Sequence, residues 1–88
     1  MRLPLSVAIE LGQRLEPAVL QEYERLLGLA SDGIFWAPVP SEYTQRYLQD
    51  DPTGVRKELL RQGLIQRDNY WDANLFSVRL PVPSITIT

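Results

Sequence analysis

The sequence contains neither cysteine nor histidine among its 88 residues. The absence of cysteine excludes disulfides, thiolate nucleophiles, iron–sulfur clusters and cysteine-based zinc sites. The absence of histidine removes the usual general base near neutral pH and the usual nitrogen ligand of metal ions. We therefore expect no metal site, no cofactor and no enzymatic activity.

The remaining candidates for catalysis are aspartates, and their positions favour a structural role. Asp50 and Asp51 precede a predicted helix, whereas Asp68 and Asp72 fall in predicted turns. Aspartate is common at such places because its carboxylate accepts hydrogen bonds from nearby backbone N–H groups. No glycine-rich phosphate loop and no nucleophile beside a base accompanies them.

Long apolar runs are missing as well. No stretch reaches the length of a transmembrane helix, and Pro4 and Glu10 interrupt the N-terminal segment where a secretory signal would need an apolar run. We expect a cytoplasmic protein without membrane contact. Length and composition predict a single domain over residues 1–88, with its core in 17–80 and flanking extended segments at 1–15 and 81–88.

Basic residues are unevenly distributed. The formal net charge is −2, with −3 in residues 1–50 and +1 in residues 51–88. An acidic chain is unsuited to binding nucleic acid by bulk electrostatics alone. Of the 9 basic residues only Lys57 is a lysine, and arginine is suited to planar, bidentate recognition of phosphate, guanine or carboxylate.

The spacing of apolar residues in the N-terminal segment fits both a strand and a helix. Apolar residues alternate from Leu3 to Leu11, which predicts a strand. A helix that begins after Ser6 is the alternative, because Val7, Leu11 and Leu15 are spaced four apart. We favour the strand.

The remaining elements are predicted from periodicity and end signals. Residues 17–30 have helical spacing with a proline at the first position, and 34–37 form a short strand. Ser41 is a candidate cap for a helix over 42–49. Asp51 as N-cap and Pro52 at the first position predict a helix over about 52–62, which Gly63 ends. The extended pattern after it predicts a β-hairpin with strands at 64–67 and 75–80.

The order of these elements predicts an α+β fold of the winged helix-turn-helix type, with three helices and a C-terminal β-hairpin wing. Residues 55–67 resemble the recognition helix and first wing strand of many bacterial winged helix regulators. Residues 41–71 resemble a small bacterial domain family of unknown function, which is predicted to be winged-helix and is sometimes appended to transcriptional regulators. The residues that carry this second resemblance are Tyr43-Thr44, Asp51-Pro52-Thr53, Val55-Arg56-Lys57, Leu59-Leu60, Gly63-Leu64-Ile65, Arg67 and Tyr70-Trp71. This second resemblance supports the fold more than a function, whereas the likeness to winged helix regulators implies DNA binding in transcription regulation.

The candidate DNA contacts lie on the predicted recognition helix and beside the wing. Residues spaced by four on a helix share one face, and a single helix fits the major groove. We therefore expect the nucleic-acid-binding residues to be Thr53, Arg56, Lys57, Arg61 and Arg67. In the alternative interpretation these charges are the solvated face of an amphipathic helix, with Glu58 partly cancelling Arg61.

A second function remains open, in which the domain binds a protein instead of DNA. Its candidate residues are aromatic: Tyr43, Tyr47, Tyr70 and Trp71. In the alternative interpretation, all four residues pack in the core, because aromatic side chains supply much of the apolar area that a small domain buries. Trp71 stands out because it lies beside the predicted hairpin turn.

The C-terminal segment 81–88 is rich in proline at its start and in β-branched residues at its end. It can pair as a strand with the N-terminal segment of the same chain, or with a second subunit to form a homodimer. A frayed terminus is the alternative.

Overall fold

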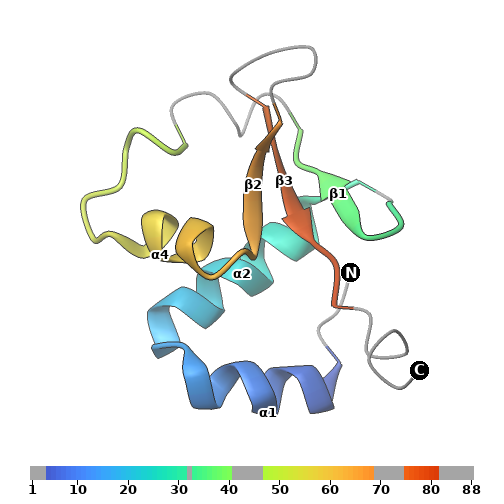
Figure 1. Cartoon of the computed structure of the whole chain (residues 1–88), viewed down its shortest axis with the longest axis vertical. Coiled ribbons are helices and arrows are strands. Elements are labelled where there is room, and N and C mark those ends of the chain that lie inside the picture. The colour runs from blue at the N-terminus through green and yellow to red at the C-terminus, as the bar shows by residue number, and fades with distance from the viewer. Residues whose placement is uncertain (1–3, 32, 41–46, 69–74, 82–88) are drawn as a thin grey trace.

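The computed structural model describes residues 4–31, 33–40, 47–68 and 75–81. Within them the chain forms three helices and three strands, an α+β arrangement. Figure 1 shows the β2–β3 hairpin with α4 and β1 on opposite sides of it and α1 at the end of the molecule away from the hairpin tip. The elements are α1 (Leu5–Arg14), α2 (Pro17–Leu29), β1 (Trp36–Pro38), α4 (Val55–Arg61), β2 (Ile65–Asp68) and β3 (Leu75–Arg79).

The three strands form one antiparallel sheet in the order β1-β3-β2. Val78 of the central strand lies opposite Ala37 on one side and Ile65 on the other. All three side chains are buried. The predicted hairpin is therefore confirmed. The first strand begins two residues later than the expected 34–37, and the residues before it, Ile34 and Phe35, are exposed.

Helix α2 confirms the prediction of a helix over 17–30, with its proline in the first turn. Its buried face carries Tyr23, Leu26 and Leu27, each only 1% exposed. This face packs against α4 and β3. The Tyr23 hydroxyl donates a hydrogen bond of 2.5 Å to the carbonyl oxygen of Arg79 at the end of β3. A single helix thus supports both the sheet and the helix that precedes the hairpin.

The predicted N-terminal strand is wrong, because Leu5–Arg14 is a helix. Both periods place Leu11 and Leu15 on one face, but only the strand period adds Leu5 and Ile9 to that face. In the structure Leu11 and Leu15 are buried, while Leu5 and Ile9 remain exposed. Contact with α2 decides between the two periods. The expected strand pairing of this segment is therefore wrong for residues 5–14, and residues 82–88, its predicted partner, lie outside the described residues.

The helix predicted over 52–62 begins later than expected, at Val55. Gly54 has a left-handed conformation with φ of 76°, so a turn separates Asp51 from the helix. The Asp51 carboxylate nevertheless accepts hydrogen bonds from the backbone N–H groups of Arg56 and Lys57, both at 3.0 Å. The prediction of Asp51 as N-cap and Pro52 as first helical residue is therefore wrong, because Gly54 occupies the N-cap position, although the Asp51 side chain still accepts from the first turn.

The end of α4 agrees with the prediction. Gly63 has φ of 75°, a conformation that side chains of L-residues rarely adopt. The chain then enters β2 through Leu64 and Ile65, which are both buried. Of the helix predicted over 42–49, residues 42–46 lie outside the described residues, and 47–49 form a turn.

Candidate nucleic-acid interface

Helix α4 has one buried face and one exposed face. Leu59 is fully buried, and Val55 and Leu60 pack against the core beside it. Lys57 and Arg61, one turn apart, are exposed. The helix is therefore anchored by leucine on its inner side and presents two basic residues on its outer side.

The strand that follows α4 adds a third basic residue. Arg67 of β2 is exposed, as is its neighbour Gln66. Because only residues 62–64 separate α4 from β2, the exposed basic residues of helix and hairpin come from one continuous segment. Thr53 is exposed too, but it lies in the turn before α4. The prediction that Thr53 shares a helical stripe with Lys57 and Arg61 is wrong, because the helix begins after it.

Arg56 is held within the fold. Its Nη1 donates hydrogen bonds to the carbonyl oxygens of Tyr47, at 2.7 Å, and Asp50, at 2.5 Å. Its guanidinium carbon lies 4.0 Å from the centroid of the Tyr47 ring, a cation–π arrangement. The side chain of Arg56, which we predicted to contact DNA, thus connects the turn before α4 to the helix itself.

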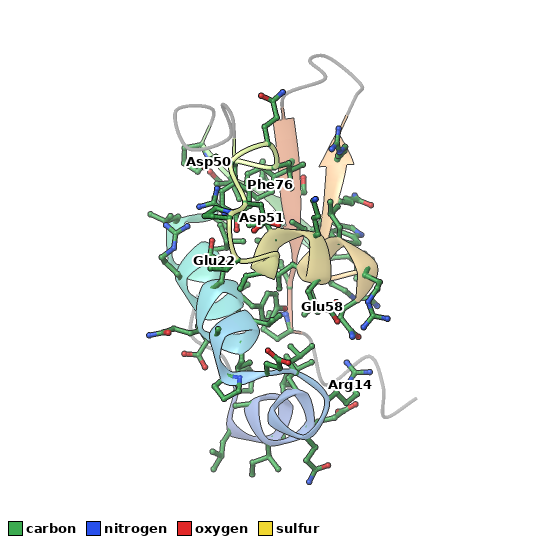
Figure 2. The ribbon with its side chains drawn as sticks, turned by 90° about the vertical axis from the view of Figure 1, so that its left-hand side faces the viewer. Arg14, Glu22, Asp50, Asp51, Glu58 and Phe76 are labelled. Carbon is green, nitrogen blue, oxygen red and sulfur yellow. The ribbon has the colours of Figure 1, made fainter. Side chains whose placement is uncertain are left out.

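The carboxylate of Glu22 on α2 interacts with three neighbouring side chains. It accepts two hydrogen bonds of 2.8 Å from Arg25 and one of 2.5 Å from the Tyr47 hydroxyl, and the Nε of Arg56 lies 3.8 Å away. We call Glu22, Arg25, Tyr47 and Arg56 the Glu22 cluster. Figure 2 shows Glu22 on the same side of the domain as Asp50 and Asp51, near the start of α4.

The charges in the Glu22 cluster stabilise each other. The hydrogen bonds from Arg25 lower the pKa of Glu22 although partial burial opposes the shift, and Tyr47 adds to the lowering. Burial, together with the hydrogen bond to Glu22, raises the pKa of Tyr47. The carboxylate therefore stays ionised and the phenol neutral over the ordinary pH range, and the cluster fixes α2 relative to the turn before α4.

A third ion pair, between Glu58 and Arg61, lies on the exposed side of α4. The Nε of Arg61 donates to Oε2 of Glu58 at 2.8 Å, and Nη2 of Arg61 donates to Oε1 of the same carboxylate. Gln62 donates to that Oε1 at 3.0 Å. The hydrogen bonds from Arg61 and Gln62 lower the pKa of Glu58 to about 2. Arg61 still has 70% of its side chain exposed.

Of the four aromatic residues that we expected to bind a protein, Tyr47 is the one among the described residues. Tyr47 is 5% exposed and stacks on Phe76 with ring centroids 4.6 Å apart. The expectation that Tyr47 forms part of an exposed partner-binding surface is therefore wrong, and the core alternative is right for this residue. Tyr43, Tyr70 and Trp71 lie outside the described residues.

Sequence reasoning missed one charged residue that the structure places near α4. Glu22 could be assigned a local pair with Arg25, because residues three apart on a helix are neighbours, but its contacts with Tyr47 and Arg56 have no signal in the sequence.

In the described part of the chain, no group of three or more aspartate or glutamate side chains is placed to hold a metal ion. Among the same residues, the helices are too short and too polar for any of them to cross a membrane. Comparisons of the chain with protein-family models, with curated proteins and with solved structures found no match.

Proposed function

We propose that this chain is a winged helix-turn-helix domain that binds duplex DNA in transcription regulation, with α4 as its recognition helix and the β2–β3 hairpin as its wing. The connectivity supports this proposal. A helix precedes the edge strand β1, and α4 stands directly before the hairpin whose second strand occupies the centre of the sheet. Fold alone does not establish function, so the proposal depends on the side chains of α4.

The observation that carries the proposal is the division of α4 into two faces. Leu59 fastens the helix to the core while Lys57 and Arg61 are exposed together on its outer side. A helix is narrow enough to enter the major groove, where such side chains reach base edges and phosphates. Arg67 on the wing is available for a phosphate contact that fixes the orientation of the domain on the duplex.

The Glu22 cluster supports the same function indirectly. Recognition by a helix needs that helix to be held at a constant angle to the rest of the domain. Arg56 bonds to the turn before α4, and its ion-pair partner Glu22 belongs to α2. In this function Arg56 is a positioning residue, while Lys57, Arg61 and Arg67 contact DNA.

The test is a fluorescence-anisotropy titration of a mixed duplex library at two salt concentrations. The natural protein should bind at low salt and lose affinity as salt rises, because each neutralised phosphate adds about 0.9 to the slope of log K against log salt. The Lys57→Ala, Arg61→Ala variant should lose most of this binding.

Arg79→Ala is the matched control, because it also removes an exposed positive charge. Arg79 belongs to β3 and lies 5.9 Å from the ring centroid of Trp36 on β1, the strand that lies across the hairpin from α4. The control should bind DNA nearly as well as the natural protein. Absence of binding by the natural protein at low salt would overturn the proposal.

The alternative of a protein-binding domain is favoured by one observation near β1. Ile34 and Phe35 are adjacent and are 79% and 56% exposed. Gly33 lies so close to the carbonyl oxygen of Trp36 that a Cβ at this position would collide with it, which shows that the chain turns tightly here. The partner that we test is a second copy of the chain. Sedimentation velocity over a range of concentrations should show self-association that Ile34→Ser, Phe35→Ser abolishes, and a monomer at every concentration would contradict it.

A further inference from the structure

Glu58 and Arg61 form a two-pronged pair on the exposed side of α4. Two donors of Arg61, at Nε and Nη2, bond to the two oxygens of one carboxylate. The pair therefore uses one edge of the planar guanidinium and leaves the edge formed by Nη1 and Nη2 pointing away from Glu58. Among the described residues Nη1 has no hydrogen-bond partner, and the side chain of Arg61 is 70% exposed.

The free edge of Arg61 matches one base. Guanine presents two acceptors in the major groove, O6 and N7, and a guanidinium binds both at once. An arginine that is already held in one rotamer loses less side-chain entropy when it binds. Gln62 bonds to the same carboxylate at 3.0 Å and so restrains Glu58 in turn. The ion pair thus leaves Arg61 able to bind a base and limits the directions in which it can do so.

We propose that Arg61 reads a guanine through its Nη1–Nη2 edge and that Glu58 is the positioning residue that holds it in that orientation. The inference rests on the proposed function, since it names the base that α4 recognises. Its target is a duplex with a guanine at the position that faces the last turn of α4. Lys57, which has no ion pair among the described residues, then supplies affinity that does not depend on sequence.

The competing explanation is that Glu58 only neutralises Arg61 and weakens its attraction to DNA. Both explanations predict tighter general binding when the negative charge is removed in Glu58→Gln. They differ in specificity. If Glu58 positions Arg61, preference for guanine falls in Glu58→Gln, whereas simple neutralisation leaves that preference unchanged or increases it.

The experiment begins with selection of duplexes from a random library by the natural protein. Each guanine of the selected duplex is then replaced singly by 7-deazaguanine, which lacks the N7 acceptor but pairs normally. We expect one position at which the replacement weakens binding about tenfold, the range expected for a bidentate contact. Arg61→Ala should be insensitive to the replacement at that position, and Glu58→Gln should show less than about a threefold effect.

Lys57→Ala is the control, because it removes a neighbouring charge on the same helix face. Lys57→Ala should weaken binding to the guanine duplex and to the 7-deazaguanine duplex by the same factor. The tenfold difference in affinity between the two duplexes should therefore remain. DNA binding by the natural protein without any position sensitive to 7-deazaguanine would overturn the inference and leave the proposed function standing. Discrimination that persists in Arg61→Ala would also overturn it. A natural protein that binds no DNA at low salt would overturn the proposed function, and the inference with it.

Discussion

The guanidinium of Arg56 lies over the ring of Tyr47, 4.0 Å from its centroid, and bonds to the carbonyl oxygen of the same tyrosine. Phe76 of β3 stacks on that ring as well. The contact joins three parts of the domain, because Arg56 belongs to α4, Tyr47 to the turn before it and Phe76 to the central strand. Arg56 is thus a basic residue of α4 whose side chain stabilises the contact between these parts of the fold.

The first prediction concerns this contact. Arg56→Ala should lower the free energy of unfolding by about 2 kcal/mol, since it removes charged hydrogen bonds to two backbone carbonyl groups and a partly buried cation–π contact. Urea denaturation followed by circular dichroism measures the change. Lys57→Ala, the neighbouring exposed residue, should stay within about 0.5 kcal/mol of the natural protein. Equal effects of the two variants would contradict the structural role of Arg56.

The second prediction compares two glycines that both have open space around the site of a Cβ. Gly63 has φ of 75°, so Gly63→Ala should destabilise the domain by about 1 kcal/mol. Gly28 lies inside α2, where alanine is the better helix former, so Gly28→Ala should stabilise by about 0.5 to 1 kcal/mol. Thermal unfolding of both variants tests the pair. The same sign for both substitutions would be inconsistent with the left-handed helix end at Gly63.

The third prediction concerns the cap of α4. Asp51→Ala removes the acceptor of two backbone N–H groups and should cost about 1 kcal/mol of stability. Although desolvation opposes the shift, these hydrogen bonds lower the pKa of Asp51. Its stabilising effect is therefore present above the ordinary pKa of 3.8 and is lost as the pH falls below it. Asp50→Ala, at an exposed carboxyl group, is the control and should leave the urea midpoint at pH 7 nearly unchanged.

The fourth prediction concerns alkaline pH. Burial raises the pKa of Tyr23 from 10.0 to about 12. A pKa that is raised in the folded state means that stability is fully present below pH 10 and falls as the pH rises from 10 toward 12, by about 2 to 3 kcal/mol in total. Urea midpoints measured between pH 9 and 12 should show this fall.

Tyr23→Phe separates the two contributions of this residue. It should be less stable near neutral pH by about 1 kcal/mol, because the hydrogen bond to Arg79 is lost. Its alkaline decline should be shallower, with the remainder due to Tyr47, whose pKa is raised as well. An alkaline decline of the same size in Tyr23→Phe would show that Tyr23 does not titrate with a raised pKa.

Much of the candidate interface was predictable because its signals are local. Lys57 and Arg61 are spaced by one turn in any helix that contains both, and the leucine at 59 requires them to face outward. The contacts of the Glu22 cluster were not predictable, because Glu22 and Tyr47 are 25 positions apart in the chain and each has ordinary local explanations. The prediction therefore placed Lys57 and Arg61 correctly at the surface of the helix but did not foresee that Arg56 is bound to Tyr47 and Asp50.

The sequence by itself determined α2, the hairpin and the glycine that ends α4, because hydrophobic period and left-handed backbone conformations are set by neighbours along the chain. Only the tertiary structure decided that residues 5–14 are a helix, since their apolar residues fit two periods and contact of Leu11 and Leu15 with the rest of the core selects one. It likewise decided which arginines face solvent. Arg56 and Arg61 have the same charge and lie on the same short helix, but Tyr47 and Glu22 lie within reach of the first, while the second pairs with Glu58 and keeps 70% of its side chain exposed.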